Sequence, residues 1–381
     1  MAAEPVARTG LIALAAIFLR LGLTAFGGPA GHIAVMRNEF VRRRGWLDDA
    51  AFVDLIGAAN LIPGPTSTEL AMHIGHRRAG RAGLVVAGLA FLLPAVLIVG
   101  ALAWFYVEHG RQPEVGALLA GIAPVVVAIV AHAGWSIART TLRGPLQVAL
   151  LMVAIAAVVG GVSEILVLLG AGALAVVIRA TSGPRLAIAI GGSDWSRGAA
   201  LALAVAATPI LILGEFLKIG AVLFGSGYVL IALLRSELVD GLRWITETQL
   251  VDAVAVGQAT PGPLFSTATF IGYVVGGPIG AVAATVGVFL PAFVAVALSI
   301  PILDRLRDSV GARAFLDGVN AAAIGLLGVV AVQLALASVR DVVGAASAAM
   351  AFWLLLRGVG TGWLIVAGAA IGLIRLLLAP V

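Results

Sequence analysis

Two Pro-Gly-Pro motifs interrupt apolar segments of this 381-residue chain, at Pro63–Pro65 and at Pro261–Pro263. Proline removes a backbone donor and fixes φ, and glycine permits a reversal, so a helix must break at each motif. Hydroxyl residues follow each break and would begin a new helix. Free N–H groups at a helix N-terminus, together with hydroxyl donors, are typical of an oxyanion-binding site.

The predicted oxyanion ligands flank both motifs. They are Asn60, Gly64, Thr66, Ser67 and Thr68 in the first copy, and Gln258, Gly262, Ser266 and Thr267 in the second. The alternative is that each motif is a structural kink whose hydroxyl groups are satisfied locally. The recurrence of the motif, with the flanking amides Asn60 and Gln258 aligned, favours a binding role.

Two cations, Arg20 and Lys218, lie at matched positions inside apolar segments, and Lys218 is the only lysine of the chain. Buried cations in a membrane are costly and usually face a cavity or a partner. We therefore predict that the two converge near the middle of the bilayer on a dianion, with arginine offering a bidentate fork and lysine a point charge. The alternatives are an ion pair of Lys218 with Glu215 on the same helix face, and an Arg20 side chain that extends toward the interface.

Three carboxylates near the motifs, Asp54, Glu69 and Asp252, are candidates for coupling transport to protons. A carboxyl group in a low-dielectric surrounding can take up and release protons, as a coupled transporter requires. Asp54 and Asp252 occupy matched positions, whereas Glu69 has no acidic counterpart. Alternatively, the two aspartates hold their hairpins through salt bridges, with Arg20 or Lys218 as partners.

The sequence gives little support for a metal site or for an enzymatic activity. The chain has no cysteine, which excludes thiolate ligands and a cysteine nucleophile. His73 and His76 have a helical spacing that suits a metal, but no third ligand accompanies them. The sequence contains no HExxH motif, no GxSxG elbow and no P-loop. We therefore expect no cofactor, no bound metal and no enzymatic activity.

The composition places these residues in a membrane. Hydrophobic residues make up 61% of the chain and charged residues 11%, less than half of the usual charged fraction. Recurrent apolar runs have the length that a bilayer span requires. The net charge of +5 does not indicate nucleic-acid binding, because the arginines fall in short loops between apolar runs. We predict a multi-pass protein of the inner membrane.

The chain is a tandem duplication. Identical residues recur at a constant spacing, including Phe18, Gly22, Trp46 and Asp54 of the first half. Chance among apolar residues would not place tryptophan, aspartate and the Pro-Gly-Pro motif together in register. The predicted organisation is a first repeat at 1–182, a cytoplasmic linker at 183–204 and a second, inverted repeat at 205–381.

About ten spans and two re-entrant Pro-Gly-Pro hairpins are predicted, which gives an all-α polytopic membrane protein. The expected spans are 9–26, 82–106, 115–138, 146–160 and 163–178 in the first repeat, and 205–227, 279–301, 314–338, 342–356 and 360–378 in the second. The hairpins are expected near 49–75 and 248–274. The short spans are close to the lower length limit for crossing a bilayer.

The distribution of arginine predicts that the second repeat is upside down. Arg37–Gly45 contains four arginines and His76–Arg81 contains three, which is typical of cytoplasmic loops. The corresponding loops of the second repeat lose this excess, because Glu237, Asp240 and Glu247 outweigh their arginines. Inverted repeats with broken helices near the bilayer midplane are the architecture of many secondary transporters.

Three strings in this order, FGGP from Phe26, GW at Gly45 and the first PGP, closely resemble the signature of the chromate ion transporter family. The second half resembles the C-terminal domain of two-domain members, so the similarity covers essentially the whole chain. The resemblance implies export of chromate, a tetrahedral dianion, driven by the membrane potential or a proton gradient. It also implies chromate resistance and a relation to transport of sulfate, the isosteric anion.

The second half departs from the signature at Gly225–Gly227, where the first has FGGP, and at Leu264-Phe265, where the first has Thr66-Ser67. We therefore expect the first repeat to contribute most to substrate binding. The alternative functions are a sulfate or other oxyanion permease, a passive anion channel, and an intramembrane enzyme or lipid-handling protein. The expected partners are the oxyanion and the lipid bilayer; a homodimer stays open, and nucleic acid is not expected.

Overall fold

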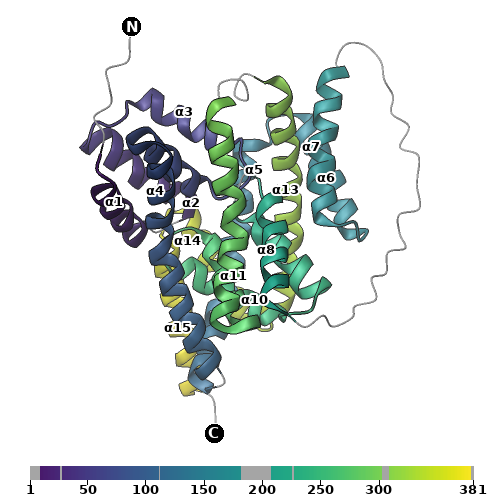
Figure 1. Cartoon of the computed structure of the whole chain (residues 1–381). Helices are drawn as coiled ribbons and strands as arrows, with labels where there is room; N and C mark the ends of the chain where they lie inside the picture. The colour runs from purple at the N-terminus through teal and green to yellow at the C-terminus, as the bar shows by residue number, and fades with distance from the viewer. Residues whose placement is uncertain are drawn as a thin grey trace.

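A computed structural model describes residues 9–25, 28–110, 112–181, 207–224, 227–302 and 309–378. The predicted linker at 183–204 lies outside these ranges. Throughout the described parts the chain is built of helices, with one isolated backbone bridge between Pro63 and Phe224. The all-α prediction is therefore confirmed, and Figure 1 shows the helices packed side by side.

The same order of elements occurs in both halves. The first half consists of α1 (Leu11–Thr24), α2 (Gly28–Arg37), the π-helical η1 (Asn38–Arg43), α3 (Asp49–Ala59), α4 (Thr66–His109), α5 (Pro113–Thr141), α6 (Pro145–Val159) and α7 (Glu164–Thr181). The second consists of α8 (Pro209–Val222), α9 (Val229–Leu234), the π-helical η2 (Arg235–Gly241), α10 (Glu247–Ala259), η3 (Leu264–Ser266), α11 (Thr267–Ser299), η4 (Ile300–Ile302), α13 (Val310–Ser338), α14 (Val342–Leu356) and α15 (Thr361–Leu378). The sequence did not indicate the two π-helical turns.

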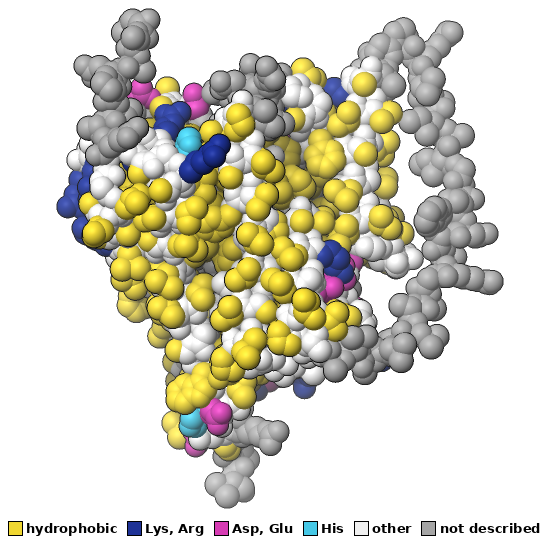
Figure 2. All heavy atoms as spheres, in the orientation of Figure 1, with side chains coloured by type: hydrophobic (Ala, Val, Ile, Leu, Met, Phe, Trp, Pro, Cys, Tyr) yellow, Lys and Arg dark blue, Asp and Glu magenta, His cyan; other side chains and the backbone are white. Residues whose placement is uncertain are grey.

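Five segments are long and apolar enough to cross a membrane: Thr66–His109, Pro113–Thr141, Leu264–Ser299, Val310–Ser338 and Thr361–Leu378. The helices α1, α6 and α14 are shorter and also apolar. Figure 2 shows hydrophobic side chains spread over the middle of one face, with most charged side chains toward its margins. The protein is therefore a multi-pass membrane protein, and the count of ten spans stays a prediction.

The chain reverses sharply inside α4 and again inside α11. Ala79 and Gly80 leave helical geometry, with φ of +63° at Gly80, a value that favours glycine. A Cβ added to Gly75 would overlap the carbonyl oxygen of Gly83. In a straight helix those two residues would be about 12 Å apart, so the segment before Gly80 folds back on the segment after it. Gly277, with φ of +62°, makes the equivalent reversal in the second half.

Replacing Gly75 with alanine should therefore destabilise the protein by about 1–3 kcal/mol, because the new methyl group meets backbone that cannot rotate away. The control is Gly170→Ala in α7, where a Cβ would meet no atom within 4 Å. Thermal unfolding of the detergent-solubilised protein measures the difference. Equal unfolding midpoints for the two variants would show that the close approach of the two limbs is absent.

The equivalent helices α4 and α11 run in opposite directions. A Cβ added to Gly88 would lie 2.6 Å from the Phe293 ring, and one added to Gly100 would lie 3.9 Å from Thr269. Thr269 in turn shares a hydrogen bond of 2.8 Å with Thr285. In the direction in which residue numbers increase along the second part of α4, they therefore decrease along the second part of α11. A two-fold axis across the helices produces this antiparallel contact, as an inverted repeat requires.

Each half also packs its later helices on the other half. The helix α5 lies against α14 and α15, and α13 lies against α6 and α7. Matched glycines make both contacts: a Cβ on Gly121 would overlap the backbone of Gly368, and one on Gly318 would overlap the backbone of Ala171. Small residues let membrane helices approach closely in this way. The two repeats therefore form one interlocked body.

Candidate functional site

The tip of each Pro-Gly-Pro hairpin binds to the other repeat. The Gly64 N–H donates to the carbonyl of Leu223, just after α8, at 2.7 Å. The Gly262 N–H donates to the carbonyl of Ala25, just after α1, at 2.9 Å. The break that the sequence predicted thus frees backbone groups, and the partner repeat satisfies them. The crossed contacts bring both tips to the boundary between the repeats.

Only glycine fits at these tips. Gly64 has φ of +139° and Gly262 has φ of +103°. A Cβ on Gly64 would lie 2.6 Å from the Cβ of Ala292 in α11, and a Cβ on Gly262 would lie 2.6 Å from the Cβ of Ala95 in α4. The predicted site residues Gly64 and Gly262 are therefore placed symmetrically, each against the long helix of the opposite repeat.

Buried polar side chains surround the first tip. Thr66, Ser67, Thr68 and Glu69 form the first turn of α4 and are 8%, 2%, 0% and 0% exposed. The amides of Thr68 and Glu69 donate to the carbonyl of Pro65, which closes the first helical turn. The Thr66 hydroxyl donates to the side-chain oxygen of the exposed Asn60 at 3.2 Å. The predicted ligands of the first motif thus lie close together around the first tip.

Several buried polar atoms near the two tips have no hydrogen-bond partner among the described residues. They are the hydroxyl oxygens of Thr68, Ser266 and Thr267, both carboxyl oxygens of Glu69, Nε2 of His32, Nε2 of His73 and Nε2 of Gln258. Buried polar groups in proteins are nearly always paired, and each exception calls for an explanation such as a ligand or water. A polar ligand or water at the tips would supply the missing partners.

His32 belongs to this site, although the sequence did not single it out. Its ring is 1% exposed, and its Nδ1 lies 3.1 Å from the Ser67 hydroxyl. The signal in the sequence was a polar residue in an apolar stretch, where the second repeat has Leu230. The same comparison sets Thr267 against Glu69 and Ile271 against His73. Among the described residues, these histidines and the glutamate thus have no histidine or carboxylate counterpart in the second repeat.

Glu69 lies directly against the first tip. A Cβ added to Gly64 would lie 2.6 Å from the Glu69 carboxyl group, and the Glu69 side chain is fully buried. Among the described residues it has no ion-pair partner. A buried carboxylate without a counter-charge is costly, so this group is held neutral by a proton or balanced by something that enters the site.

The predicted coupling residue Asp252 borders a different part of the molecule. Asp252 is 4% exposed and accepts a hydrogen bond of 2.8 Å from the Tyr106 hydroxyl, at the far end of α4. It borders a separate cavity of about 360 Å³ that Arg340 also lines. The alternative of a salt bridge between Asp252 and Lys218 is wrong, since Asp252 binds Tyr106 instead. Asp54 is partly buried on α3, and its coupling role stays a prediction.

The structure does not bring Arg20 and Lys218 together. Both side chains are exposed, and each lies beside the π-helical turn of its own repeat. Lys218 forms ion pairs of 2.6 Å with Glu215 and with Glu237. The ion pair with Glu215 that the sequence offered as an alternative is thus confirmed. A role for either cation in substrate binding stays a prediction.

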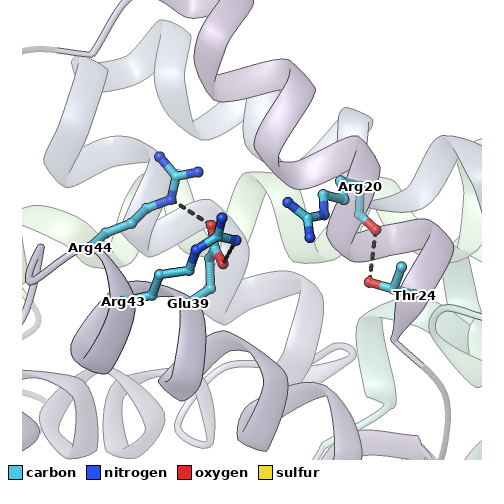
Figure 3. Close-up of polar contacts among 5 residues, drawn as sticks. All are labelled: Arg20, Thr24, Glu39, Arg43 and Arg44. Atoms are coloured by element: carbon cyan, nitrogen blue, oxygen red, sulfur yellow. Dashed lines mark hydrogen bonds and ion pairs between the residues drawn. The ribbon is translucent and has the colours of Figure 1, made fainter.

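Arg20 faces a cluster of charged residues on η1 (Figure 3). Glu39 accepts hydrogen bonds from Arg44 at 2.6 Å and from Arg43 at 3.1 Å. Partial burial works to raise the pKa of Glu39, but the hydrogen bonds and charges of Arg44 and Arg43 outweigh it and hold the pKa below its usual range. Glu39 therefore stays ionised at neutral pH and anchors both arginines.

Replacing Lys218 with methionine should lower the stability by about 1–2 kcal/mol, because Glu215 and Glu237 would face each other without a cation. Solvent screening keeps the cost below that of a fully buried pair. The matched control is the triple variant Glu215→Gln, Lys218→Met, Glu237→Gln, which should recover the thermal unfolding midpoint. Full stability of Lys218→Met together with lost transport would instead support a role in substrate binding.

Comparison with known proteins also divides the chain into two copies of one domain. The sequence profile of the family described as "Chromate transporter" matches residues 12–177 and 210–373. A chromate transport protein of Pseudomonas aeruginosa is 37% identical over 84% of this chain and 80% of its own length. A chromate transport protein of Cupriavidus metallidurans is 34% identical over 94% of this chain and 91% of its own length. No solved structure matches the chain. Both copies of the family domain are thus present, and the chain belongs to the chromate transporter family.

Proposed function

We propose that this protein exports chromate from the cytoplasm across the inner membrane and thereby confers chromate resistance. The observation that carries the proposal is the set of buried, unpartnered polar groups in the two hairpins, whose tips each bind to the opposite repeat. The hydroxyl groups of Ser67, Thr68, Ser266 and Thr267 and the amide of Gln258 would donate to the oxygens of the anion, whereas the Thr66 hydroxyl already donates to Asn60. The relatives named as chromate transport proteins support chromate as the substrate.

The start of α4 would add to this binding. The N–H group of Ser67 is in the first turn of the helix, where no preceding carbonyl of the helix is available. A helix N-terminus carries a partial positive charge that favours an anion. Glu69 in the same turn would oppose a dianion when ionised. We therefore propose that chromate binds while Glu69 is protonated, so that substrate and proton movements are linked.

The membrane potential favours export. A dianion leaving a cell that is negative inside gains about 2.3 kcal/mol per charge for each 100 mV. Export driven by the potential alone is therefore feasible. A proton that left with the anion on Glu69 would cancel one unit of the exported charge, so this coupling would make the rate depend on pH and would reduce the gain from the potential. Asp54 and Asp252 remain candidates for the same coupling role.

Uptake of radioactive chromate into inverted membrane vesicles tests the proposal. We expect uptake that saturates, that depends on this protein, and that increases when the vesicle interior is made positive. Vesicles with the Ser67→Ala and Thr68→Ala double variant should take up chromate at least tenfold more slowly, because two donors are lost. Absence of protein-dependent uptake would overturn the proposed function.

Sulfate is the second candidate substrate, because it has the same shape and charge as chromate. Uptake of radioactive sulfate in the same vesicles, with no preference for chromate in competition, would support a general oxyanion permease.

An anion channel would give fluxes far above carrier rates, and an intramembrane enzyme would consume a membrane substrate without moving chromate. The oligomeric state, including a homodimer, is tested by crosslinking in the membrane.

A further inference from the structure

A cavity of about 380 Å³ in the first repeat holds an excess of positive charge that the proposed site at the hairpin tips does not use. It lies between α1 and η1, and its charged and polar lining residues are Arg20, Thr24, Asn38, Glu39, Arg43 and Arg44. Three arginines face a single carboxylate there. Both carboxyl oxygens of Glu39 already accept hydrogen bonds from Arg43 and Arg44, so Glu39 cannot neutralise Arg20 as well.

The guanidinium of Arg20 is the free donor group of this cavity. It points toward the cluster of Glu39 and Arg43 (Figure 3). Among the described residues the Arg20 side chain has no hydrogen bond or ion pair; only its backbone carbonyl is engaged, by the Thr24 hydroxyl. A guanidinium presents five donors in a planar fork that matches an oxyanion.

The second repeat provides a comparison on the same scaffold. Lys218 takes the place of Arg20, and Gly241 and Leu242 take the places of Arg43 and Arg44. An additional carboxylate, Glu215, stands where the first repeat has an apolar residue, and Lys218 pairs with it and with Glu237. The net charge is +2 around the first cavity and −1 around its counterpart. Only one of the two equivalent places is therefore suited to an anion.

The cavity also adjoins the boundary between the repeats. Thr24 lines it, and the next residue, Ala25, accepts the hydrogen bond from Gly262 at the second hairpin tip. The arginine-rich turn that forms its other wall belongs to the loops that the distribution of arginine predicts to be cytoplasmic. An anion held in this cavity would thus lie at the cytoplasmic approach to the tips.

We infer that this cavity captures a tetrahedral oxyanion before it reaches the hairpin tips, with Arg20 as its main ligand. The inference rests on the proposed function, since it makes the captured anion the transported one. Clustered positive charge raises the local concentration of a dianion and its rate of association. The same chemistry fits the phosphate group of an anionic lipid, and the test below separates the two sources.

The test uses the purified full-length protein in liposomes of phosphatidylcholine. Arg20→Gln should raise the KM for chromate about tenfold and leave the maximal rate within twofold, because capture is impaired while the tips are intact. Equilibrium binding of chromate should weaken by a similar factor. Arg20→Lys should fall between the two, since it keeps the charge and loses the fork. Arg139→Gln, which removes an exposed arginine at the end of α5, is the control for net charge and should match the wild type.

Three outcomes would overturn the inference. The first is an unchanged KM in Arg20→Gln, and the second is a reduced maximal rate with an unchanged KM, which would place Arg20 in the translocation step. The third is a defect that appears only when phosphatidylglycerol is added to the liposomes, which would identify a lipid site. Failure of the proposed function looks different, because the wild-type protein itself would then not move chromate.

Discussion

Replacing Gly64 with alanine is expected to abolish chromate transport and to destabilise the protein by about 1–3 kcal/mol. The residue has φ of +139°, which alanine rarely adopts. The new methyl group would lie 2.6 Å from both the Cβ of Ala292 and the carboxyl group of Glu69. It would therefore push the hairpin tip away from α11 and break the hydrogen bond of 2.7 Å to Leu223. Vesicle uptake and thermal unfolding measure the two effects.

A neighbouring glycine supplies the control. Gly57→Ala lies on α3 of the same hairpin, where a Cβ would meet nothing within 4 Å, and it should behave like the wild type. Gly262→Ala should reproduce the defect of Gly64→Ala, because its tip is equivalent and packs on Ala95. Adding Ala292→Gly to Gly64→Ala should restore part of the stability by removing one of the two overlaps. Wild-type transport by Gly64→Ala would show that the tip does not dock on the other repeat.

Replacing Glu69 with glutamine is expected to remove the response of transport to a proton gradient and to lower the gradient-driven rate at least tenfold. The amide has nearly the same shape as the protonated carboxyl group but can neither release a proton nor carry a charge. Chromate binding should therefore persist in the variant and become independent of pH. In the wild type, binding should weaken as pH rises, because an ionised Glu69 repels a dianion.

Chromate uptake into proteoliposomes, with the pH gradient and the potential imposed separately, measures this effect. The control is Glu114→Gln at the exposed start of α5, which should keep the wild-type response. Uptake driven by the potential should survive in Glu69→Gln. A pH dependence identical to that of the wild type would assign the coupling to another group, and Asp252→Asn and Asp54→Asn would then be the variants to examine.

The elements that carry the site were predictable because their signals are local. Proline and glycine break a helix wherever they occur, so both hairpins and the hydroxyl-rich start of α4 followed from Pro63–Pro65 and its copy. The opposite orientation of the repeats followed from the arginine distribution and agrees with the antiparallel contact of α4 and α11.

The contacts between the repeats were not predictable, because they depend on which helix faces which. An apolar, glycine-rich sequence does not indicate that Gly64 packs on Ala292 or that Tyr106 forms a hydrogen bond with Asp252. Helix geometry explains why Arg20 and Lys218 do not converge as expected. Lys218 lies two residues before Gly220, which packs on α11, and two residues turn a helix by about 200°. Its side chain therefore points away from α11, the helix against which the first hairpin tip lies.

The crossed hairpin tips have a consequence for how the protein is made. The motif at Pro63–Pro65 leaves the ribosome long before Leu223 and Ala292, on which it docks, have been synthesised. At typical elongation rates this delay is on the order of ten to fifty seconds. Throughout that time the newly inserted N-terminal half carries an unfinished polar loop inside the lipid. We therefore expect its maturation to depend on an insertion machinery or chaperone that shelters the loop until the second half arrives.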